Sequence, residues 1–319
     1  MMAEFPAMML VALAIDRLIG WPEWLYARIG HPVTWGGRLV AILEARLNRA
    51  GFPLRLMGAL TLALCLIAVL LLSVAVQLLL PDSALGIVAG GCLAWPLVAV
   101  RSMRDHVAAI EKPLIAGDLP KARGAVSMIV GRNPDVLDEA GVARAALESL
   151  AENTSDGIIA PVFWGAVAGL PGIAAYKMIN TLDSMIGHQN PRYLQFGWPS
   201  ARLDDWVNLI PARATGLIFA LVSGRPLRAG RIMLRDARRH RSPNAGWPEA
   251  AMAGALGVRL SGPRVYDGAV MPEPWLNPAA PDPRPEALTR GLGLYRRAIM
   301  LLMAALVIFA LLPVALEAF

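Results

Sequence analysis

The stretch LMGALTLALCLIAVLLLSVAVQLLL, residues 56–80, decides the class of fold. It runs for 25 residues without a charged side chain, and about 18 apolar residues in a row are enough for an α-helix to cross a bilayer. The run has no polar face, which disfavours the alternative of a helix buried in a large soluble core. The sequence therefore predicts a membrane-spanning helix here.

Three further apolar runs, residues 5–15, 85–100 and 298–316, predict that the chain crosses the membrane several times. Hydrophobic residues make up 56% of the chain and charged residues 17%, a balance unlike that of a soluble domain. Arginines gather between residues 15 and 56, so the positive-inside rule places that connection in the cytoplasm. Because this topology explains the net charge of +6, we expect a lipid bilayer and no nucleic acid as partner.

One membrane-embedded domain is predicted to occupy residues 1–319, with two of its parts in the cytoplasm. Residues 101–156 have the pattern of amphipathic helices, broken near Pro113 and Pro134. Residues 225–297 are rich in arginine, proline and glycine, so we expect a loop-rich segment there with one helical island.

Two apolar stretches, residues 157–179 and 206–223, are interrupted. The first contains Pro161 and Pro171, and the second contains Arg213. If the arginine-rich segment that follows is cytoplasmic, both stretches cross the membrane or neither does. Irregular backbone and charge at membrane depth are tolerated only where protein or a wet cavity surrounds them. We therefore expect broken or re-entrant helices that do not cross, within an all-α polytopic membrane fold.

Three carboxylates, Glu148, Glu152 and Asp156, recur at every fourth residue in LESLAENTSDG, residues 147–157. On an α-helix this spacing puts them on one stripe about 12 Å long. Like charges stacked in this way repel one another, and the repulsion grows as the local dielectric falls. We therefore expect arginine side chains or a divalent cation to neutralise them.

Two more acidic sites follow, NTLDSM with Asp183 and SARLDDWVNLIPAR with Asp204 and Asp205. Buried carboxylates cost free energy unless they are paired or bind a metal. Oxygen ligands of this kind suit Mg²⁺, which also binds the phosphates of a substrate. The alternative is an internal arginine–carboxylate network that only ties helices together. The candidate metal ligands are Glu148, Glu152, Asp156, Asp183, Asp204 and Asp205.

Other motifs narrow the chemistry. A P-loop is excluded because the sequence holds no G-x-x-x-x-G-K-[ST] pattern. His31 precedes Pro32 at the start of a predicted helix, so a capping or packing role is expected for it. We expect His106, His188 and His240 to be solvated. No Ser-His-Asp or Cys-His arrangement follows from the spacing.

Ordered blocks along nearly the whole chain resemble those of the CobD/CbiB family of cobalamin biosynthesis. The opening blocks are DRLIGWPEW and HPVTWGGRL, and IVGRNPDVLDE lies near the centre. The most distinctive blocks are ESLAENTSDGIIAPVFW, AYKMINTLDSMIG, ARLDDWVNLIPAR and HRSPNAGWPEAAMAGALGVRLSGP. Two positions depart from the family pattern, because Asn133 stands where Asp is common and His188 replaces the usual Tyr.

The resemblance implies an ATP-dependent ligase, an adenosylcobinamide-phosphate synthase. Such an enzyme joins the propionate of adenosylcobyric acid, a corrinoid, to the amine of (R)-1-amino-2-propanol O-phosphate, with ATP and Mg²⁺. It also implies a multi-pass protein of the bacterial inner membrane whose active site faces the cytoplasm. Association with other membrane enzymes of late cobalamin assembly is a further expectation.

Roles for residues in the matching blocks are hypotheses at this stage. Arg202 and Arg213 are expected to clamp a phosphate group, and Glu152 to accept the proton of the attacking amine. The candidate catalytic residues are Glu148, Glu152, Asp156 and Asp183. The candidate substrate-binding residues are Arg132, Asn153, Asn180, Arg202, Asn208, Arg213 and Asn244.

Two other functions stay open on the sequence alone. The stretch ENTSDG superficially resembles the motif of Mg²⁺-dependent membrane phosphotransferases of the CDP-alcohol type, but the downstream Asp spacing of that motif is missing. A non-catalytic membrane regulator that shares the fold is the second alternative. The many acidic residues in the matching blocks disfavour it, because a scaffold has little use for uncompensated carboxylates.

Overall fold

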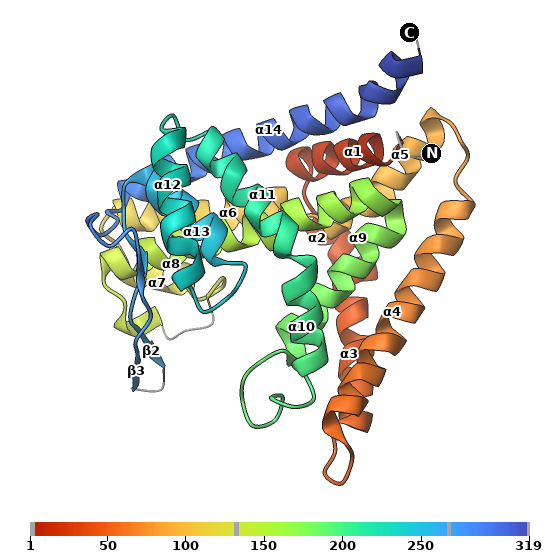
Figure 1. Ribbon diagram of the computed structural model, residues 1–319, viewed down its shortest axis with the longest axis horizontal. Helices are drawn as coiled ribbons and strands as arrows, with labels where there is room; N and C mark the ends of the chain where they lie inside the picture. Colours follow the sequence, from red (N-terminus) through yellow and green to blue (C-terminus); the bar gives the residue numbers. More distant parts are fainter. Residues whose placement is uncertain (1–3, 131–133, 267–268, 318–319) are drawn as a thin grey trace. The chain divides into compact units, whose positions relative to one another are not determined.

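The computed structural model describes residues 4–130, 134–266 and 269–317 and is 76% helical (Figure 1). By length and composition, four described helices are able to cross a membrane: residues 54–78, 84–115, 139–186 and 286–312. The bent pair 4–18 and 23–47 adds a fifth if it forms one span. The chain is therefore an all-α polytopic membrane protein, as its apolar runs predict.

The contacts divide the chain into two compact units, which are described separately. Unit 1 comprises residues 1–99, 160–208 and 305–319, and unit 2 comprises residues 100–159 and 209–304. The arrangement of residues 1–319 as a single membrane-embedded domain stays a prediction.

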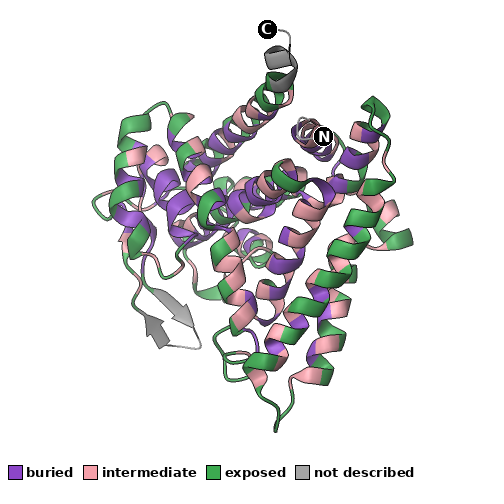
Figure 2. Cartoon of the chain, turned by 45° about the vertical axis from the view of Figure 1, so that its right-hand side comes forward, coloured by how far each residue is buried: buried purple, intermediate pink, exposed green. Residues whose placement is uncertain are grey.

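Unit 1 is a bundle of helices around α4. Helix α4 packs against α9 and α3, and α1 packs against α5 and α9. Its core includes Cys65, Leu182 and Phe196, whereas Leu72 and Leu78 of α4 are exposed and fit contact with lipid. Figure 2 shows buried stretches in purple and exposed stretches in green along the helices. The elements are α1 Glu4–Leu18, α2 Glu23–Ile29, α3 Pro32–Leu47, α4 Leu54–Leu78, α5 Ala84–Ala94, the 3₁₀ turn η1 Trp95–Leu97, α9 Ala160–Ile186 and α10 Trp198–Val207.

Helix α9 is broken near its middle. Ala168 and Gly169 have non-helical backbone angles, and Gly169 has φ 63°, which glycine adopts at little cost. The side chain of Gln77 accepts a hydrogen bond from the backbone N–H of Leu170 at 2.7 Å. A polar residue of the long apolar helix thus replaces a bond that the break removes, and the prediction of a broken helix is confirmed.

The start of α3 is capped by histidine. Nδ1 of His31 accepts a hydrogen bond from the backbone N–H of Val33 at 3.2 Å, and Oγ1 of Thr34 accepts one from the N–H of His31 at 3.3 Å. Pro32 occupies the first turn of the helix, where its missing N–H costs nothing. The capping role predicted for His31 is confirmed.

Gly58 offers a test of the packing in unit 1. A Cβ atom there would lie 1.8 Å from the backbone oxygen of Phe196, so Gly58→Ala is expected to lower the free energy of unfolding by about 2 kcal/mol. Gly124→Ala is the matched control, because no atom lies within 4 Å of its Cβ position and alanine favours a helix. Thermal unfolding in detergent measures both. A Gly58→Ala protein as stable as wild type would contradict the close packing.

Unit 2 is built around the buried helix α13, which packs against α8, α11 and α12. Its two short antiparallel strand pairs align Leu260 with Leu276 and Val265 with Val270. The elements are α6 Val100–Ile115, α7 Leu119–Val126, the 3₁₀ turn η2 Pro134–Val136, α8 Glu139–Thr154, the π-helix η3 Ser155–Ile159, α11 Leu209–Leu221, α12 Pro226–Asp236, the 3₁₀ turn η4 Ala237–Arg239, α13 Gly246–Leu256, β1 Leu260–Ser261, β2 Arg264–Tyr266, β3 Ala269–Met271 and β4 Trp275–Leu276. The last helix, α14 Glu286–Glu317, begins in this unit.

Two sequence expectations for this part of the chain need correction. Helix α6 continues through Pro113 to Ile115, so the break expected at the proline comes later, at Gly117, whose φ is 77°. Pro113 is buried, and packing therefore outweighs the local preference of proline to end a helix. The loop-rich part is also narrower than 225–297, because α12, α13 and the start of α14 lie within that range.

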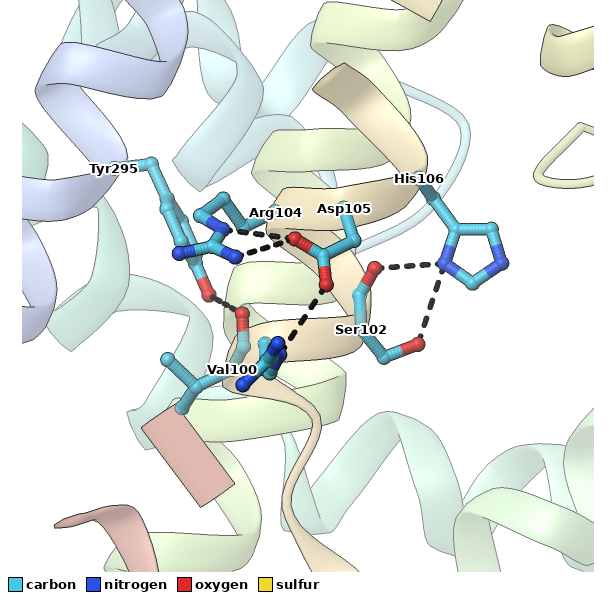
Figure 3. A network of polar contacts seen from close by, with 7 residues as sticks. Val100, Ser102, Arg104, Asp105, His106 and Tyr295 are labelled. Carbon is cyan, nitrogen blue, oxygen red and sulfur yellow. Dashed lines mark hydrogen bonds and ion pairs between the residues drawn. The ribbon is translucent and has the colours of Figure 1, made fainter. Parts of the chain in front are cut away.

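A polar network on α6 illustrates how charges at the surface of unit 2 are arranged (Figure 3). Arg104 donates to the carboxylate of Asp105 at 2.6 Å, and Arg101 lies 3.5 Å from the same side chain. The hydroxyl of Tyr295 donates to the backbone oxygen of Val100 at 2.7 Å. This bond joins α14 to the first residue of α6.

The two interrupted apolar stretches lie in helices of different length. Residues 157–179 lie inside one of the candidate spans, residues 139–186, whereas the helix at 209–221 is too short for a candidate span. The expectation that neither stretch crosses stays a prediction.

Candidate functional site

In unit 1, α9 and α10 bring together several of the predicted site residues. After the break, α9 places Tyr176, Asn180 and Asp183 at positions i, i+4 and i+7, which share one face. Helix α10 packs against α9 and begins after Gly197, where a Cβ atom would lie 1.7 Å from the backbone oxygen of Ile186. Glycine is therefore required where the start of α10 meets the end of α9.

A chain of hydrogen bonds connects the two helices. The hydroxyl of Tyr176 donates to Oδ1 of Asn208 at 2.9 Å, and Nδ2 of Asn208 donates to Oδ2 of Asp204 at 3.0 Å. Tyr176 and Asn208 are buried. Because each donor has its acceptor, this chain fixes the orientation of the Asp204 carboxylate.

The Asp204 carboxylate is in an unusual environment for an acidic group. Burial, helped by the charge of Asp183, raises the pKa of Asp204 from 3.8 to about 7, although hydrogen bonding by Asn208 and Asn180 opposes the change. Its Oδ1 atom is buried and has no hydrogen-bond partner in the part of the chain that the structure describes. Such a group is suited to take up a proton or a cation near neutral pH.

Asp205 and Arg202 form a more exposed pair beside it. Nη1 of Arg202 lies 3.7 Å from Oδ2 of Asp205. Burial raises the pKa of Asp205, and the Arg202 guanidinium opposes that change. The structure therefore places Arg202 beside the carboxylates, and its exposed guanidinium is accessible to an anionic ligand.

In unit 2, Glu148 is buried with 5% of its surface exposed. Its Oε1 atom accepts a hydrogen bond from the backbone N–H of Ser261 at 2.7 Å, and Ser261 has the left-handed φ of 59°. Glu148 thus holds β1 against α8. A backbone N–H supplies part of the neutralisation that the sequence led us to expect from arginine or a cation.

The three carboxylates of the predicted stripe do not share one environment. Helix α8 ends at Thr154, and Asp156 lies in the π-helix η3. A π-helix bonds residues i and i+5, so the backbone hydrogen-bond pattern changes where Asp156 lies. Glu152 is exposed and Asp156 partly buried. The prediction that the three carboxylates form one stripe stays a prediction.

The side chain of Asn153 is engaged by its own helix. Its Nδ2 atom donates to the backbone oxygen of Ser149 at 2.9 Å and approaches the hydroxyl of Ser149 at 3.1 Å. Asn153 is also exposed on the surface of α8. Its predicted role in substrate binding stays a prediction.

Arg213 and Asn244 lie at the two ends of a small cluster around Trp247. The guanidinium of Arg213 lies 4.5 Å from the centre of the Trp247 ring, and its Nη1 donates to the backbone oxygen of Leu209 at 2.6 Å. The backbone N–H of Trp247 donates to the backbone oxygen of Asn244 at 3.1 Å. The indole face thus orients a cation that the sequence assigned to phosphate binding.

A buried histidine lies next to this cluster and was missed in the sequence. The side chain of His240 is 5% exposed, and its Nε2 lies 3.7 Å from Oε1 of the buried Glu249. Its Nδ1 accepts a hydrogen bond from the N–H of Ser242 at 3.1 Å. The expectation of a solvated His240 is wrong because the turn after α12 folds back onto α13. His106 and His188 are exposed, as expected.

The six predicted carboxylates fall into two groups of three, one in each unit. Asp183, Asp204 and Asp205 belong to unit 1, and the three on α8 and η3 belong to unit 2. Arg132 lies outside the described residues. Among residues 4–130, 134–266 and 269–317, no three His, Cys, Asp or Glu side chains are placed to hold a metal ion.

Magnesium needs fewer protein ligands than such a cluster provides. It keeps several waters and binds through one or two carboxylates plus the phosphates of a substrate. The Oδ1 atom of Asp204 has no hydrogen-bond partner in the described residues, and Asp183 lies close enough to perturb it. These oxygen donors fit Mg²⁺ in that mode of binding.

The fold and these sites define a polytopic helical membrane protein with carboxylate and amide groups gathered at the ends of broken or short helices. The family model described as CobD/Cbib protein matches residues 9–295. The chain therefore belongs to the CobD/CbiB family of cobalamin biosynthesis.

Curated relatives agree with this assignment. A Rhodobacter capsulatus protein named "Cobalamin biosynthesis protein CobD" is 66% identical over 296 residues, which cover 93% of this chain and 94% of the relative. Proteins of the same name from Brucella suis biovar 1 and Rhizobium meliloti are 50% and 47% identical. The Brucella alignment covers 84% of this chain and 85% of the relative, and the Rhizobium alignment covers 88% of each. No solved structure matches the chain.

Proposed function

We propose that the protein condenses adenosylcobyric acid with (R)-1-amino-2-propanol O-phosphate, at the expense of ATP, to give adenosylcobinamide phosphate. The observation that carries this proposal is the family match over residues 9–295. The polar group of unit 1, with a carboxylate held by Asn208 and an arginine beside it, is compatible with a reaction among anionic substrates.

The chemistry requires activation of a carboxylate. A carboxylate repels an incoming nucleophile, and oxide is a poor leaving group. In the proposed reaction a propionate oxygen attacks the terminal phosphorus of ATP, and ADP leaves. The amine then attacks the acyl carbon, loses a proton, and inorganic phosphate leaves. Negative charge builds up in both steps, so catalysis requires nearby cations and hydrogen-bond donors.

Asp204 is better suited than Glu152 to accept the proton of the amine. Glu152 is exposed, whereas the Asp204 carboxylate is held in place by a hydrogen bond from Asn208. The raised pKa of Asp204, about 7, is close to the pH at which a general base works best. We therefore propose Asp204 as the general base in place of Glu152, although the sequence analysis named Asp204 only as a candidate metal ligand.

The other candidates keep the roles that their positions support. Arg202 and Arg213 would clamp phosphate groups, since both guanidinium groups are held by neighbouring aromatic rings. Asp183 would hold Mg²⁺, which when bound supplies charge for the phosphates of ATP. We further propose that the protein resides in the bacterial inner membrane with this site facing the cytoplasm, where it associates with other membrane enzymes of late cobalamin assembly.

A trapping experiment tests the activated carboxylate. The purified protein, supplied with adenosylcobyric acid, ATP and Mg²⁺ but no amino alcohol, is expected to form a corrinoid hydroxamate when hydroxylamine is added, because hydroxylamine attacks acyl phosphates. Mass spectrometry measures the hydroxamate, and a coupled assay measures ADP in equal amount. A reaction without corrinoid is the control. Release of ADP without hydroxamate would contradict the acyl phosphate, and the absence of both would contradict the ligase activity.

A further inference from the structure

Helix α12 has two very different faces. Ala229, Ile232, Met233 and Asp236 are buried at spacings of three and four residues, and this face packs against α13 and α11, which lie beside α12 (Figure 1). The opposite face exposes large apolar side chains. Leu227 is 83% exposed and Leu234 is 66% exposed. Exposed apolar side chains that gather on one face and are bordered by polar residues indicate contact with a membrane or a protein.

Arginines surround these two leucines. Seven lie between residues 225 and 241, and Asp236 is the one acidic residue in that range. The side chain of Asp236 is fully buried and pairs with Arg235 and Arg239, and Arg241 approaches Glu273. Within the described residues no ion pair involves the remaining ones, which are Arg225, Arg228, Arg231 and Arg238.

The spacing puts leucines and arginines on the same side of the helix. Leu227, Arg231 and Leu234 are separated by four and three residues, so they form one stripe. Arg228 and Arg235 lie next to it on the exposed side. Helix α11 has a second exposed stripe, made of Ile210, Leu217 and Leu221, and its 13 residues are too few to cross a bilayer.

We propose that α12 lies in the headgroup region of an anionic phospholipid leaflet. Leu227 and Leu234 insert below the phosphates, and the unpaired arginines bind the phosphate oxygens. The helix has the apolar residues, the basic flank and the low overall hydrophobicity of interfacial helices, and each basic residue adds to the attraction of an anionic surface. We identify the partner of this face as the bilayer, because the same chain carries four helices able to span one.

Nitroxide labels on the full-length protein test this proposal. After Cys65 and Cys92 are replaced by serine, single cysteines at positions 227 and 234 carry the label in vesicles of phosphatidylcholine with phosphatidylglycerol. Val136, which is 60% exposed in η2, is the labelled control site. Labels at 227 and 234 are expected to collide more with oxygen than with a water-soluble nickel complex, and the label at 136 is expected to show the opposite.

The charge dependence gives a second measurement. Arg228→Gln with Arg231→Gln is expected to lower the ratio of lipid-inserted to non-inserted label 234 about 25-fold, because each of the two basic residues contributes about fivefold near an anionic leaflet. Vesicles of phosphatidylcholine alone, which carry no net charge, are also expected to lower the insertion of label 234. Labels at 227 and 234 that stay as accessible to nickel as the label at 136, in both lipids, would overturn the proposal and leave an acidic protein as the partner of this face.

Discussion

Asp204→Asn is expected to lower the turnover number for adenosylcobinamide phosphate about a thousandfold. The substitution keeps the shape of the side chain but removes both its charge and its basicity, and general bases typically contribute on the order of a hundredfold to ten-thousandfold. The hydrogen bond from Asn208 to Oδ2 of Asp204 still has an acceptor oxygen in the asparagine, so the local fold is expected to persist. Product is measured by chromatography of the corrinoids.

The control for this variant is an aspartate outside the candidate site, which forms an exposed ion pair. Asp105→Asn removes the partner of Arg101 and Arg104 on α6 (Figure 3), and its activity is expected to match wild type. If Asp204→Asn retained wild-type turnover, Asp204 would be neither base nor magnesium ligand. The candidate site in unit 1 would then have lost its central group.

The same variant has a predicted signature in stability. The pKa of Asp204 is raised to about 7 in the folded protein, so the folded state binds a proton more tightly than the unfolded state. Asp204 therefore destabilises the fold as pH rises from its ordinary pKa toward about 7. In buffer with a chelator, Asp204→Asn is expected to unfold at a higher temperature than wild type at about pH 8, with a smaller difference at about pH 5. A difference independent of pH would contradict the raised pKa.

Asp236→Asn is expected to lower the free energy of unfolding by about 3 kcal/mol, the cost of disrupting a buried charged group and its hydrogen bonds. Its carboxylate is fully buried, accepts hydrogen bonds from Arg235 at 2.6 Å and 2.8 Å, and accepts one from the backbone N–H of Asn277 at 2.8 Å. Asn277 in turn donates to the backbone oxygens of Ala253 and Val258. One side chain thus joins α12 to α13 and to the chain after β4.

The pH dependence of this effect has the opposite sign to that of Asp204. Burial alone would raise the pKa of Asp236, but the bonds from Arg235 and Asn277 outweigh it and lower that pKa. Its stabilisation is therefore present above the ordinary pKa near 4 and is lost as pH falls through the lowered value. Chemical unfolding is expected to show the full difference at neutral pH and a smaller one below about pH 4. Asp105→Asn removes an exposed ion pair and is expected to change the free energy of unfolding by less than about 1 kcal/mol.

Much of the fold could be predicted from local patterns because membrane helices need only length and apolarity. The run at 56–80 corresponds to α4 Leu54–Leu78, since no polar group interrupts it. The break in α9 was expected from Pro171, and it lies two to three residues earlier, at Ala168 and Gly169, because proline lacks an N–H and its ring clashes with the preceding helical turn. The apolar run at residues 298–316 predicted only the later part of α14. The helix begins earlier, at Glu286, with residues that are more polar.

The rest depended on contacts between distant residues, which one sequence does not reveal. Pro113 stays inside α6 because it is buried. Asp156 lies in a π-helix rather than an α-helix, and this element packs against α11. His240 is buried because the chain after it folds back onto α13, and its partner Glu249 is nine residues away. The sequence named Asp204 as a site candidate, but its raised pKa comes from burial and from the charge of Asp183 on another helix.

The interruption at Ala168 and Gly169 has a consequence for how such proteins change over time. In a continuous helix, one inserted residue rotates every later side chain by about 100° and moves it by about 1.5 Å, which would carry Asp183 away from Asp204. At the interruption, a glycine conformation and the amide of Gln77 can absorb that change. The part of α9 before residue 168 is therefore free to gain or lose a residue, while the part after it keeps its register with α10.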